Sequence, residues 1–236
     1  MESKILVAGA TGRTGRIIVE KLIQQAQNPH VLVRDITTAK MLFNGSVTYH
    51  AGDVREPDTL RSCMAGVQVV ISAIGSNTPV GKNCPKRVDY EGVVNLVAAA
   101  ETQGAAHFIL ISSIAVTQPE HPLNRFGRIL DWKLKSEQAL RESGLRYTII
   151  RPAGLTDVRA SERMLQFDQG DRVMGTISRA NVADTCLIAI NLPQSRCVTF
   201  EVIEDDQLDG QPDWIKLFGS LKPDPIERNC RDDMVI

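Results

Sequence analysis

A glycine-rich run near the start of the chain has the residue types and the spacing of a phosphate-binding turn. Gly9, Gly12 and Gly15 directly follow the apolar segment Lys4–Ala8. Glycine lets the backbone turn tightly and approach a pyrophosphate closely, and the start of a following helix offers free N–H groups to the anion. The alternative is a glycine turn without a ligand. The residues expected to hold the dinucleotide here are Gly9, Thr11, Gly12, Arg13, Thr14 and Gly15.

The two residues after the second apolar strand, His30–Val33, bear on which dinucleotide binds. At this place an NADP site carries a cation for the 2′-phosphate, and an NAD site carries an acid for the ribose hydroxyl. Arg34 supplies a guanidinium, which can bind phosphate through two parallel hydrogen bonds. Asp35 leaves an alternative open, because it could bind the ribose or cap the next helix. We expect NADP as the cofactor.

Two further turns are expected to contact the nucleotide. Asp53 and Val54 follow the third apolar strand, and the Asp53 carboxylate could accept a hydrogen bond from the adenine amino group or cap the next turn. The fourth strand ends in small residues, which leave room for the nucleotide ribose, although a plain strand-to-loop turn would look similar. The residues expected to contact the nucleotide at this second turn are Ala73, Ile74 and Gly75.

Short apolar, β-branched runs alternate with helical patterns along the first two thirds of the chain. Strands are predicted at Lys4–Ala8, His30–Val33, Val47–His50, Val67–Ser72, His107–Ile111 and Arg146–Ile150. Helices are predicted around Ile17–Ile23 and at Thr38–Leu42, Pro57–Met64, Arg87–Thr102 and Phe126–Ser143. This alternation implies right-handed crossovers, and nearly continuous apolar strands suit a parallel sheet covered on both faces. The prediction is an α/β fold with a Rossmann-like, doubly wound parallel sheet.

The residues beyond Gly154 depart from this alternation. The elements predicted there are a short helix at Glu162–Phe167, a helix at Arg179–Leu192 with Ser178 as its cap, and a late strand at Cys197–Ile203. They are too few for an independent second domain. We therefore expect one NAD(P)-binding domain over residues 1–236. It would comprise a nucleotide-binding core (1–153), a small C-terminal substrate-side extension (154–221) and a loose tail (222–236).

The composition restricts the classes of protein to which the chain can belong. Of its 236 residues, 43% are hydrophobic and 23% are charged, as in ordinary globular proteins. Lys and Arg number 27 against 28 Asp and Glu, so no nucleic-acid partner is expected. The five scattered cysteines form no C-x-x-C pair, which disfavours a disulfide scaffold and a metal site. Because an apolar segment follows Met1 almost directly and no run of about 18 apolar residues exists, we expect a cytoplasmic protein without a membrane span.

Taken together, the motifs resemble those of atypical short-chain dehydrogenase/reductases of the NmrA-like, NAD(P)H-binding group. The matching segments run in order from about residue 4 to residue 203. They are GATGRTG (Gly9–Gly15), VLVRD (Val31–Asp35), GDV (Gly52–Val54), SAIG (Ser72–Gly75), VDYEGVVNLVAAA (Val88–Ala100), HFILISSIAV (His107–Val116), WKLKSEQALRESGLRYTIIRPAGL (Trp132–Leu155) and SRANVAD (Ser178–Asp184). The resemblance implies a Rossmann-like fold that binds NAD(P)H.

The resemblance also implies which residues act near the nicotinamide. Family members carry a Ser or Thr after the fifth strand, which matches Ser113, and a Lys on the next helix that holds the ribose. Lys135 stands two residues before Glu137, as that Lys usually does, while Lys133 remains a second candidate. Ser113 could equally well only close the strand end. The stretch containing Pro152 is expected to pass by the nicotinamide.

One part of the family's catalytic apparatus is missing from this sequence. Family members place a Tyr four residues before the Lys, where it exchanges a proton with a carbonyl or alcohol oxygen. The three tyrosines, Tyr49, Tyr90 and Tyr147, are followed four residues later by Asp, Val and Arg, so no Y-x-x-x-K motif exists. Ordinary alcohol–ketone oxidoreduction is therefore disfavoured, whereas hydride transfer to a flavin, bilin or quinone can take its proton from solvent.

Two structural expectations accompany these functional ones. Tyr90 is expected either to face the site or, as we favour, to lie half-buried in the core. Glu137 and Arg141 are expected to form an ion pair on the surface of their helix.

These observations favour an NADPH-dependent reductase that passes hydride to a conjugated acceptor such as a flavin, bilin or quinone. The alternative is a non-catalytic NADP(H)-sensing regulator or assembly factor, because a sensor does not need the missing tyrosine. The expected partner is a small-molecule acceptor in the first case and a protein in the second. The acceptor pocket would be built from loops 75–86, 117–125 and 154–177, and the oligomeric state stays open.

Overall fold

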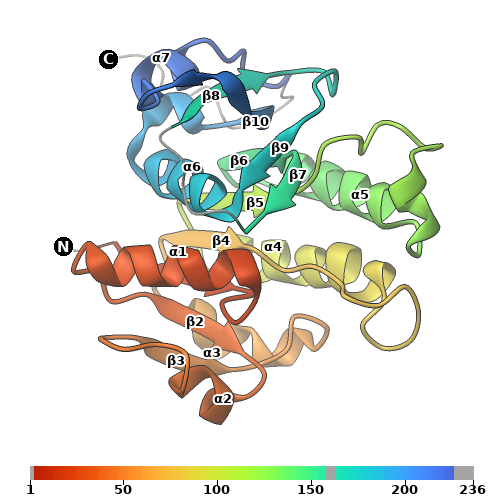
Figure 1. Cartoon of the computed structure of the whole chain (residues 1–236). Coiled ribbons are helices and arrows are strands. Elements are labelled where there is room, and N and C mark those ends of the chain that lie inside the picture. Colours follow the sequence, from red (N-terminus) through yellow and green to blue (C-terminus); the bar gives the residue numbers. More distant parts are fainter. Residues whose placement is uncertain (1–2, 158–162, 226–236) are drawn as a thin grey trace.

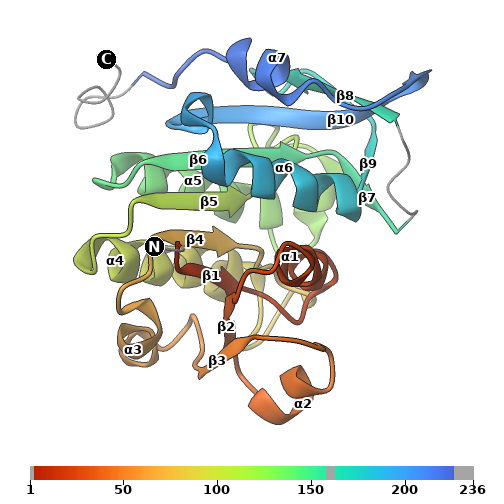
Figure 2. The ribbon, with the colours of Figure 1, turned by 90° about the vertical axis from the view of Figure 1, so that its left-hand side faces the viewer.

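An eight-stranded sheet runs through the protein, and seven of its strands are parallel (Figures 1 and 2). The computed structural model describes residues 3–157 and 163–225. The strand order is β3-β2-β1-β4-β5-β6-β10-β8, with β8 antiparallel at one edge. The strands are β1 (Ile5–Ala8), β2 (His30–Val33), β3 (Thr48–Ala51), β4 (Val69–Ser72), β5 (His107–Ile111), β6 (Tyr147–Pro152), β8 (Arg163–Asp168) and β10 (Val198–Asp209). This order confirms the predicted doubly wound, Rossmann-like fold.

Helices cover both faces of the sheet, as the apolar strands predicted (Figure 1). On one face lie α1 (Arg13–Gln24), the short α2 (Ile36–Lys40) and α6 (Arg179–Asn191). On the other lie α3 (Arg61–Met64), α4 (Val93–Thr102) and α5 (Ile129–Glu142). Along β1, Ile5 and Val7 pack into the first layer, while Leu6 and Ala8 pack into the second. Alternate side chains point to opposite faces, so the strand must be apolar throughout.

Short helical segments of other geometry accompany the predicted helices. A π-helical segment, Lys86–Gly92, leads directly into α4, so the helix predicted at Arg87–Thr102 has two geometries. Three 3₁₀ turns lie at Pro57–Thr59, Pro122–Arg125 and Pro193–Ser195. Single-turn π geometry is common at functional sites, and here it carries Asp89 toward the cleft described below.

The helix predicted at Glu162–Phe167 is wrong for residues 163–167, and Glu162 lies outside the described residues. Residues Arg163–Asp168 form β8, which pairs antiparallel with β10 and places Leu165 in the core. The late strand is confirmed as β10, the seventh parallel strand of the sheet, and Ser178 caps α6 by accepting a hydrogen bond from Asn181 N at 3.1 Å. Much of the stretch predicted as a substrate-side extension therefore completes the main sheet.

The strands β7 (Gly154–Thr156) and β9 (Thr176–Ser178) form a separate two-stranded sheet near the cleft. Toward the C-terminal end, α7 (Trp214–Gly219) packs near β8. The first residues of the predicted loose tail are anchored, because Asp224 accepts hydrogen bonds from Tyr147 Oη at 3.0 Å and Thr199 Oγ1 at 2.6 Å. The rest of that tail, 226–236, lies outside the described residues.

The described cysteines are of two kinds. Cys63, Cys84 and Cys186 are free thiols, whereas Cys197 is disulfide-bonded, which the cysteine spacing did not predict. Within the described residues, every helix is too short or too polar to cross a lipid bilayer.

Candidate functional site

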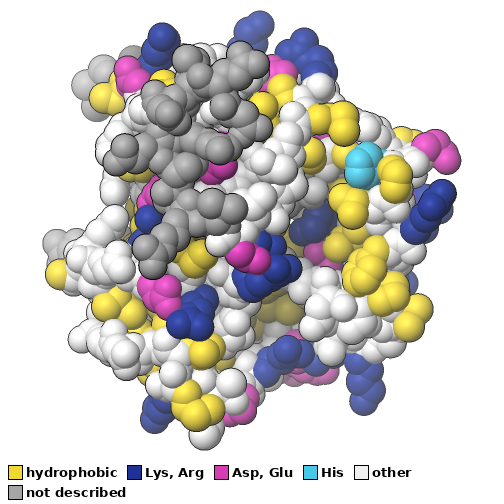
Figure 3. Space-filling model, viewed as in Figure 1, with side chains coloured by type: hydrophobic (Ala, Val, Ile, Leu, Met, Phe, Trp, Pro, Cys, Tyr) yellow, Lys and Arg dark blue, Asp and Glu magenta, His cyan; other side chains and the backbone are white. Residues whose placement is uncertain are grey.

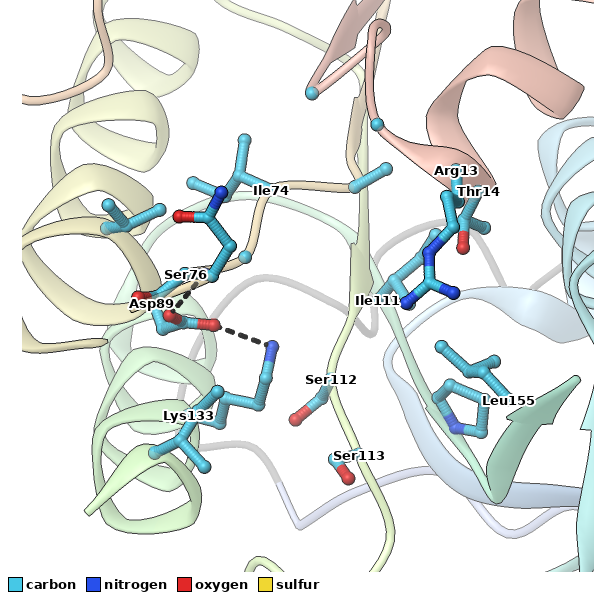
Figure 4. A pocket seen from close by; sticks show the side chains of 18 of the residues that line it. Arg13, Thr14, Ile74, Ser76, Asp89, Ile111, Ser112, Ser113, Lys133 and Leu155 are labelled. Carbon is cyan, nitrogen blue, oxygen red and sulfur yellow. Dashed lines mark hydrogen bonds and ion pairs between the residues drawn. The ribbon is translucent and has the colours of Figure 1, made fainter. Parts of the chain in front are cut away.

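A cleft of about 1010 Å³ opens where the parallel strands end, and almost every residue expected to bind the nucleotide lines it (Figure 4). In open α/β sheets ligands bind at this edge, where the strand order reverses. The predicted residues in the cleft wall are Gly9, Thr11, Gly12, Arg13, Thr14, Arg34, Asp53, Val54, Ala73, Ile74, Gly75, Ser113 and Pro152. Gly15 and Lys135 do not line it.

The glycine loop leaves space and N–H groups for a pyrophosphate. Gly9 has φ +81°, and a Cβ there would lie 2.6 Å from the carbonyl oxygen of Ala73, so no side chain fits. Gly12 stands at the start of α1, and no side chain caps this helix. Its first N–H groups and the positive end of its dipole therefore face the cleft, as an anion requires. These residues fit the pyrophosphate of a dinucleotide.

Gly15 is a packing position of α1 and does not line the cleft. It lies within α1 and is buried, and a Cβ on it would stand 2.2 Å from the carbonyl oxygen of Gly9. A side chain at this position would therefore push the helix away from the glycine loop. The third glycine of the motif therefore allows α1 to pack closely against the glycine loop.

At the end of β2, Arg34 lines the cleft and Asp35 caps the helix that follows. The Asp35 carboxylate caps α2, accepting from Thr37 N at 2.8 Å and from Thr38 Oγ1 at 2.6 Å. The hydrogen bonds with Thr38 lower the pKa of Asp35. Arg34 is exposed at the cleft, with its Nη1 3.5 Å from Asn83 Oδ1. Asp35 thus has the capping role that the sequence left open.

Asp53 is held by a neighbour that the sequence analysis missed. Arg55 donates from Nε to Asp53 Oδ1 at 2.9 Å and from Nη2 to Oδ2 at 2.5 Å. The side-chain hydrogen bond from Arg55 lowers the pKa of Asp53. Arg55 also donates to Lys82 O at 2.8 Å, which ties the loop after β4 to the end of β3. The one sequence feature that could have indicated this ion pair is the short spacing of two residues between Asp53 and Arg55.

The lysine that lines the cleft is Lys133. Its Nζ lies 3.0 Å from Asp89 Oδ1, and the two side chains are 14% and 0% exposed (Figure 4). The contact is an ion pair rather than a well-aligned hydrogen bond. The other Asp89 oxygen accepts from Ser76 N at 2.9 Å. Ser112 and Ser113 line the cleft from the end of β5, as Figure 4 shows.

Lys135 lies elsewhere on the same helix. It is exposed, and its Nζ stands 4.5 Å from the ring centroid of Trp132, outside the cleft lining. Trp132 in turn stacks on Tyr90 at 5.7 Å, so that half-buried tyrosine packs on another ring and does not face the site. The two lysines are two residues apart on α5, and that separation turns them to different sides of the helix. Of the two candidate lysines, the structure therefore places Lys133 in the cleft and Lys135 outside it.

A buried ionic network lies behind Ser112, and it overturns the expectation of a surface pair at Glu137 and Arg141. The Glu137 side chain is fully buried. It accepts from Ser112 Oγ at 2.5 Å, from Arg151 Nη2 at 2.7 Å and from Arg141 Nη2 at 2.9 Å. Burial alone would lower the pKa of Arg151, but its bonds to Glu137 and Glu201 outweigh that and raise it. Because Ser112 directly follows β5, its hydrogen bond to Glu137 fixes the end of that strand.

Asp171 clamps together two loops that line the cleft. Its Oδ1 accepts from Ala115 N at 2.5 Å, and its Oδ2 accepts from Thr117 N at 2.9 Å and from Thr117 Oγ1 at 2.7 Å. The Asp171 N–H donates to Glu201 Oε2 at 2.9 Å. The loop after β5 and the loop between β8 and β9 are therefore held at a fixed separation. No local sequence pattern indicated this residue.

Arg179 is a further lining residue that the sequence analysis did not select. It begins α6, its side chain is 7% exposed, and its Nη1 donates to Asp157 Oδ1 at 2.6 Å. The second oxygen of Asp157 accepts from Arg13 Nη1 at 3.1 Å. One carboxylate therefore links the glycine loop to α6 across the cleft.

The doubly wound sheet, the uncapped glycine loop and the cleft at the strand ends define a dinucleotide-binding Rossmann protein. The chain belongs to the NAD(P)H-binding family, whose model matches residues 9–193, and within it to the NmrA-like group of atypical short-chain dehydrogenase/reductases. It is 36% identical to the chloroplastic protein At2g34460 of Arabidopsis thaliana over 214 residues (85% of this chain, 75% of that one). It is 29% identical to sanguinarine reductase of Eschscholzia californica (84% and 88%). Among solved structures, it is similar to a putative NAD-dependent epimerase/dehydratase from Bacillus halodurans, with a TM-score of 0.79, 25% identity and coverage of 92% and 99%.

Proposed function

We propose that the protein is an NADPH-dependent reductase that passes hydride to a conjugated acceptor such as a flavin, bilin or quinone. The observation that carries the proposal is the Lys133–Asp89 ion pair, which lines the same cleft as Ser113 and the glycine loop. The name of its relative sanguinarine reductase also supports a reductase. Bound NADPH would supply the hydride.

The preference for NADPH over NADH rests on Arg34 and Asp35. Both carboxylate oxygens of Asp35 already accept hydrogen bonds from α2, which favours a capping role over a ribose contact. Arg34 is exposed at the same end of the cleft. Its guanidinium can pair with the 2′-phosphate that only NADPH carries.

Lys133 would have two roles in this reaction. Its ammonium is suited to hold the ribose hydroxyls, as the family resemblance implies, and it can donate a proton to the reduced acceptor. Asp89 keeps that ammonium in place. Its buried carboxylate needs a partner charge, and separating the two groups would leave it unpaired. Ser113 can donate a hydrogen bond to an acceptor oxygen or nitrogen. With Lys133 as the proton donor, this reaction does not need a Tyr.

The competing function is a non-catalytic NADP(H)-sensing regulator or assembly factor. The experiment that separates the two is NADPH oxidation by the purified protein against a panel of flavins, bilins and quinones, with NADPH affinity measured in parallel. Turnover that disappears in Lys133→Met supports the reductase. Tight NADPH binding without turnover on any acceptor would refute it and favour the sensor.

A further inference from the structure

Two loops beside the cleft present the same short pattern of exposed side chains. The first carries PVGK (Pro79–Lys82), and the second carries PLNR (Pro122–Arg125). In each loop an aliphatic residue stands two positions before a cation. Val80 is 74% exposed and Leu123 is 49% exposed, and both cations are exposed as well. Figure 3 shows hydrophobic and basic side chains gathered at the right-hand side of the molecule, where Figure 1 draws these loops.

The two loops, 75–86 and 117–128, touch each other. Gly127 in the second loop has φ +58°, and a Cβ on it would lie 2.5 Å from the carbonyl oxygen of Pro79 in the first. Only glycine allows this close approach. A side-chain hydrogen bond also closes each loop on itself, at 2.5 Å in the first and at 2.9 Å in the second. The two tips therefore form one surface, held in place by contacts within and between the loops.

These loops are basic although the whole chain is almost neutral. Together they contain four Lys and Arg residues and one acid, Glu120, so their net charge is +3, against −1 for the whole chain. Within the part of the chain that the structure describes, neither Lys82 nor Arg125 forms an ion pair. The other two cations, Lys86 and Arg128, each pair with an acid of the adjoining helix. The unpaired positive charge therefore lies at the two aliphatic tips.

Exposed aliphatic side chains beside unpaired cations suit the surface of an anionic membrane. The aliphatic group can enter the boundary between headgroups and acyl chains, while the cation stays at the phosphate layer. A protein partner fits less well, because aromatic side chains usually anchor protein interfaces. Of Phe, Tyr and Trp, the two loops contain only Phe126, and it is half-buried. The side chains of these loops therefore favour lipid over protein.

We infer that the two loop tips dock the protein on an anionic lipid surface. Val80 and Leu123 enter the headgroup region, and Lys82 and Arg125 contact the lipid phosphates. Because Leu123 also lines the cleft, docking turns the cleft opening toward the lipid and gives a lipid-dissolved molecule a short path into it. The inference does not depend on the proposed reduction, since the loops bind lipid whether or not NADPH is oxidised.

The first test measures sedimentation of the whole protein with lipid vesicles. The probes are vesicles of phosphatidylcholine alone and vesicles that also contain about 30% phosphatidylserine. We expect at least about ten-fold tighter binding to the anionic vesicles at low salt, and loss of most of that binding near about 0.5 M salt, because the lipid charge attracts the loop cations. Absence of binding, or equal binding to both kinds of vesicle, would overturn the inference.

Matched variants on two exposed surfaces locate the contact. Val80→Asp should weaken binding to anionic vesicles by about ten-fold, because it removes an aliphatic group and adds a negative charge. Its control is Ile215→Asp on α7, where the side chain is 71% exposed. Lys82→Glu should weaken binding similarly, with Lys216→Glu on α7 as its control. None of the four residues lines the cleft, so NADPH binding should stay unchanged. Equal loss in the loop and α7 variants would contradict the assignment.

A third measurement separates insertion from attraction by charge alone. In anionic vesicles with brominated acyl chains, the added fluorescence of Val80→Trp should be quenched and that of Ile215→Trp should not, after subtraction of the signal of the unsubstituted protein. Equal quenching of both variants, or of neither, would contradict insertion of the loop tips. Calorimetric binding of polyglutamate by a protein that binds no vesicles would assign the loops to an acidic protein partner and overturn the inference.

Discussion

The two lysines of α5 provide a matched test of the site. Lys133→Met removes the partner of Asp89, whose side chain is fully buried, and leaves that charge unpaired. Breaking a buried pair from one side costs about 3 kcal/mol of unfolding free energy. Lys135→Met removes only an exposed cation 4.5 Å from the Trp132 ring, worth about 0.5–1 kcal/mol. We therefore expect a clear difference in urea unfolding between variants two residues apart.

Activity should divide the two variants in the same way. We expect Lys133→Met to lower kcat/KM for the acceptor by about 100-fold, the size of effect expected for loss of a proton donor, and Lys135→Met to change it less than two-fold. The assay is NADPH oxidation at a temperature where both variants are fully folded. Loss of activity in Lys135→Met with activity retained in Lys133→Met would refute the assignment.

A double variant separates stability from catalysis. Lys133→Met combined with Asp89→Asn removes both charges, so part of the lost stability should return. Activity should stay low, because no ammonium is restored. Strictly additive losses of stability would mean that the two side chains are not coupled, contrary to the 3.0 Å contact.

The remaining predictions concern cofactor choice, the glycine loop and pH. Arg34→Ala should weaken NADPH binding by about 30-fold (about 2 kcal/mol) and leave NADH binding nearly unchanged. Titration of the variant with both nucleotides measures this difference. Equal weakening of both would exclude a contact between Arg34 and the 2′-phosphate. Gly12→Val should abolish NADPH binding while circular dichroism shows an intact fold, and unchanged affinity would mean that the loop is only a turn. Burial, then Lys4 and His50, lower the pKa of His30 to about 4. The unfolded chain therefore takes up protons between pH 6.5 and 4 that the folded chain does not, so unfolding free energy should fall as pH drops through that range, and less steeply in His30→Asn.

The strand pattern and the glycine loop could be predicted because their signals are local. The run Lys4–Ala8, followed by glycines and an amphipathic helix, already specifies a strand, a tight turn and a helix start. The structure places Gly9 and Gly12 in the cleft wall, where that reasoning put them. Arg34 follows from the same logic, because its position depends only on the end of β2.

The edge strand β8 could not be recognised in the same way. Its six residues, Arg163–Asp168, are too few for periodicity to separate a strand from a helix. Its conformation depends on pairing with β10, more than thirty residues later in the chain. Tertiary pairing of this kind overrides local propensity.

The wall of the cleft beyond the nucleotide was the least predictable part. Glu137 reads as a surface residue from its (i, i+4) spacing to Arg141, yet it is buried because Arg151 and Ser112 meet it from β6 and from the end of β5. The choice between Lys133 and Lys135 likewise depended on which side of α5 faces the cleft, and the spacing to Glu137 that the resemblance suggested did not reveal it. Such partners are distant in sequence, so no local pattern connects them.

The most direct test of the central claim is turnover itself. Purified protein should oxidise NADPH in the presence of a flavin, bilin or quinone, as followed by nucleotide absorbance, and NADH should support a much lower rate. The rate should collapse in Lys133→Met and persist in Lys135→Met. NADPH that binds tightly but is never oxidised, with any flavin, bilin or quinone, would contradict the account.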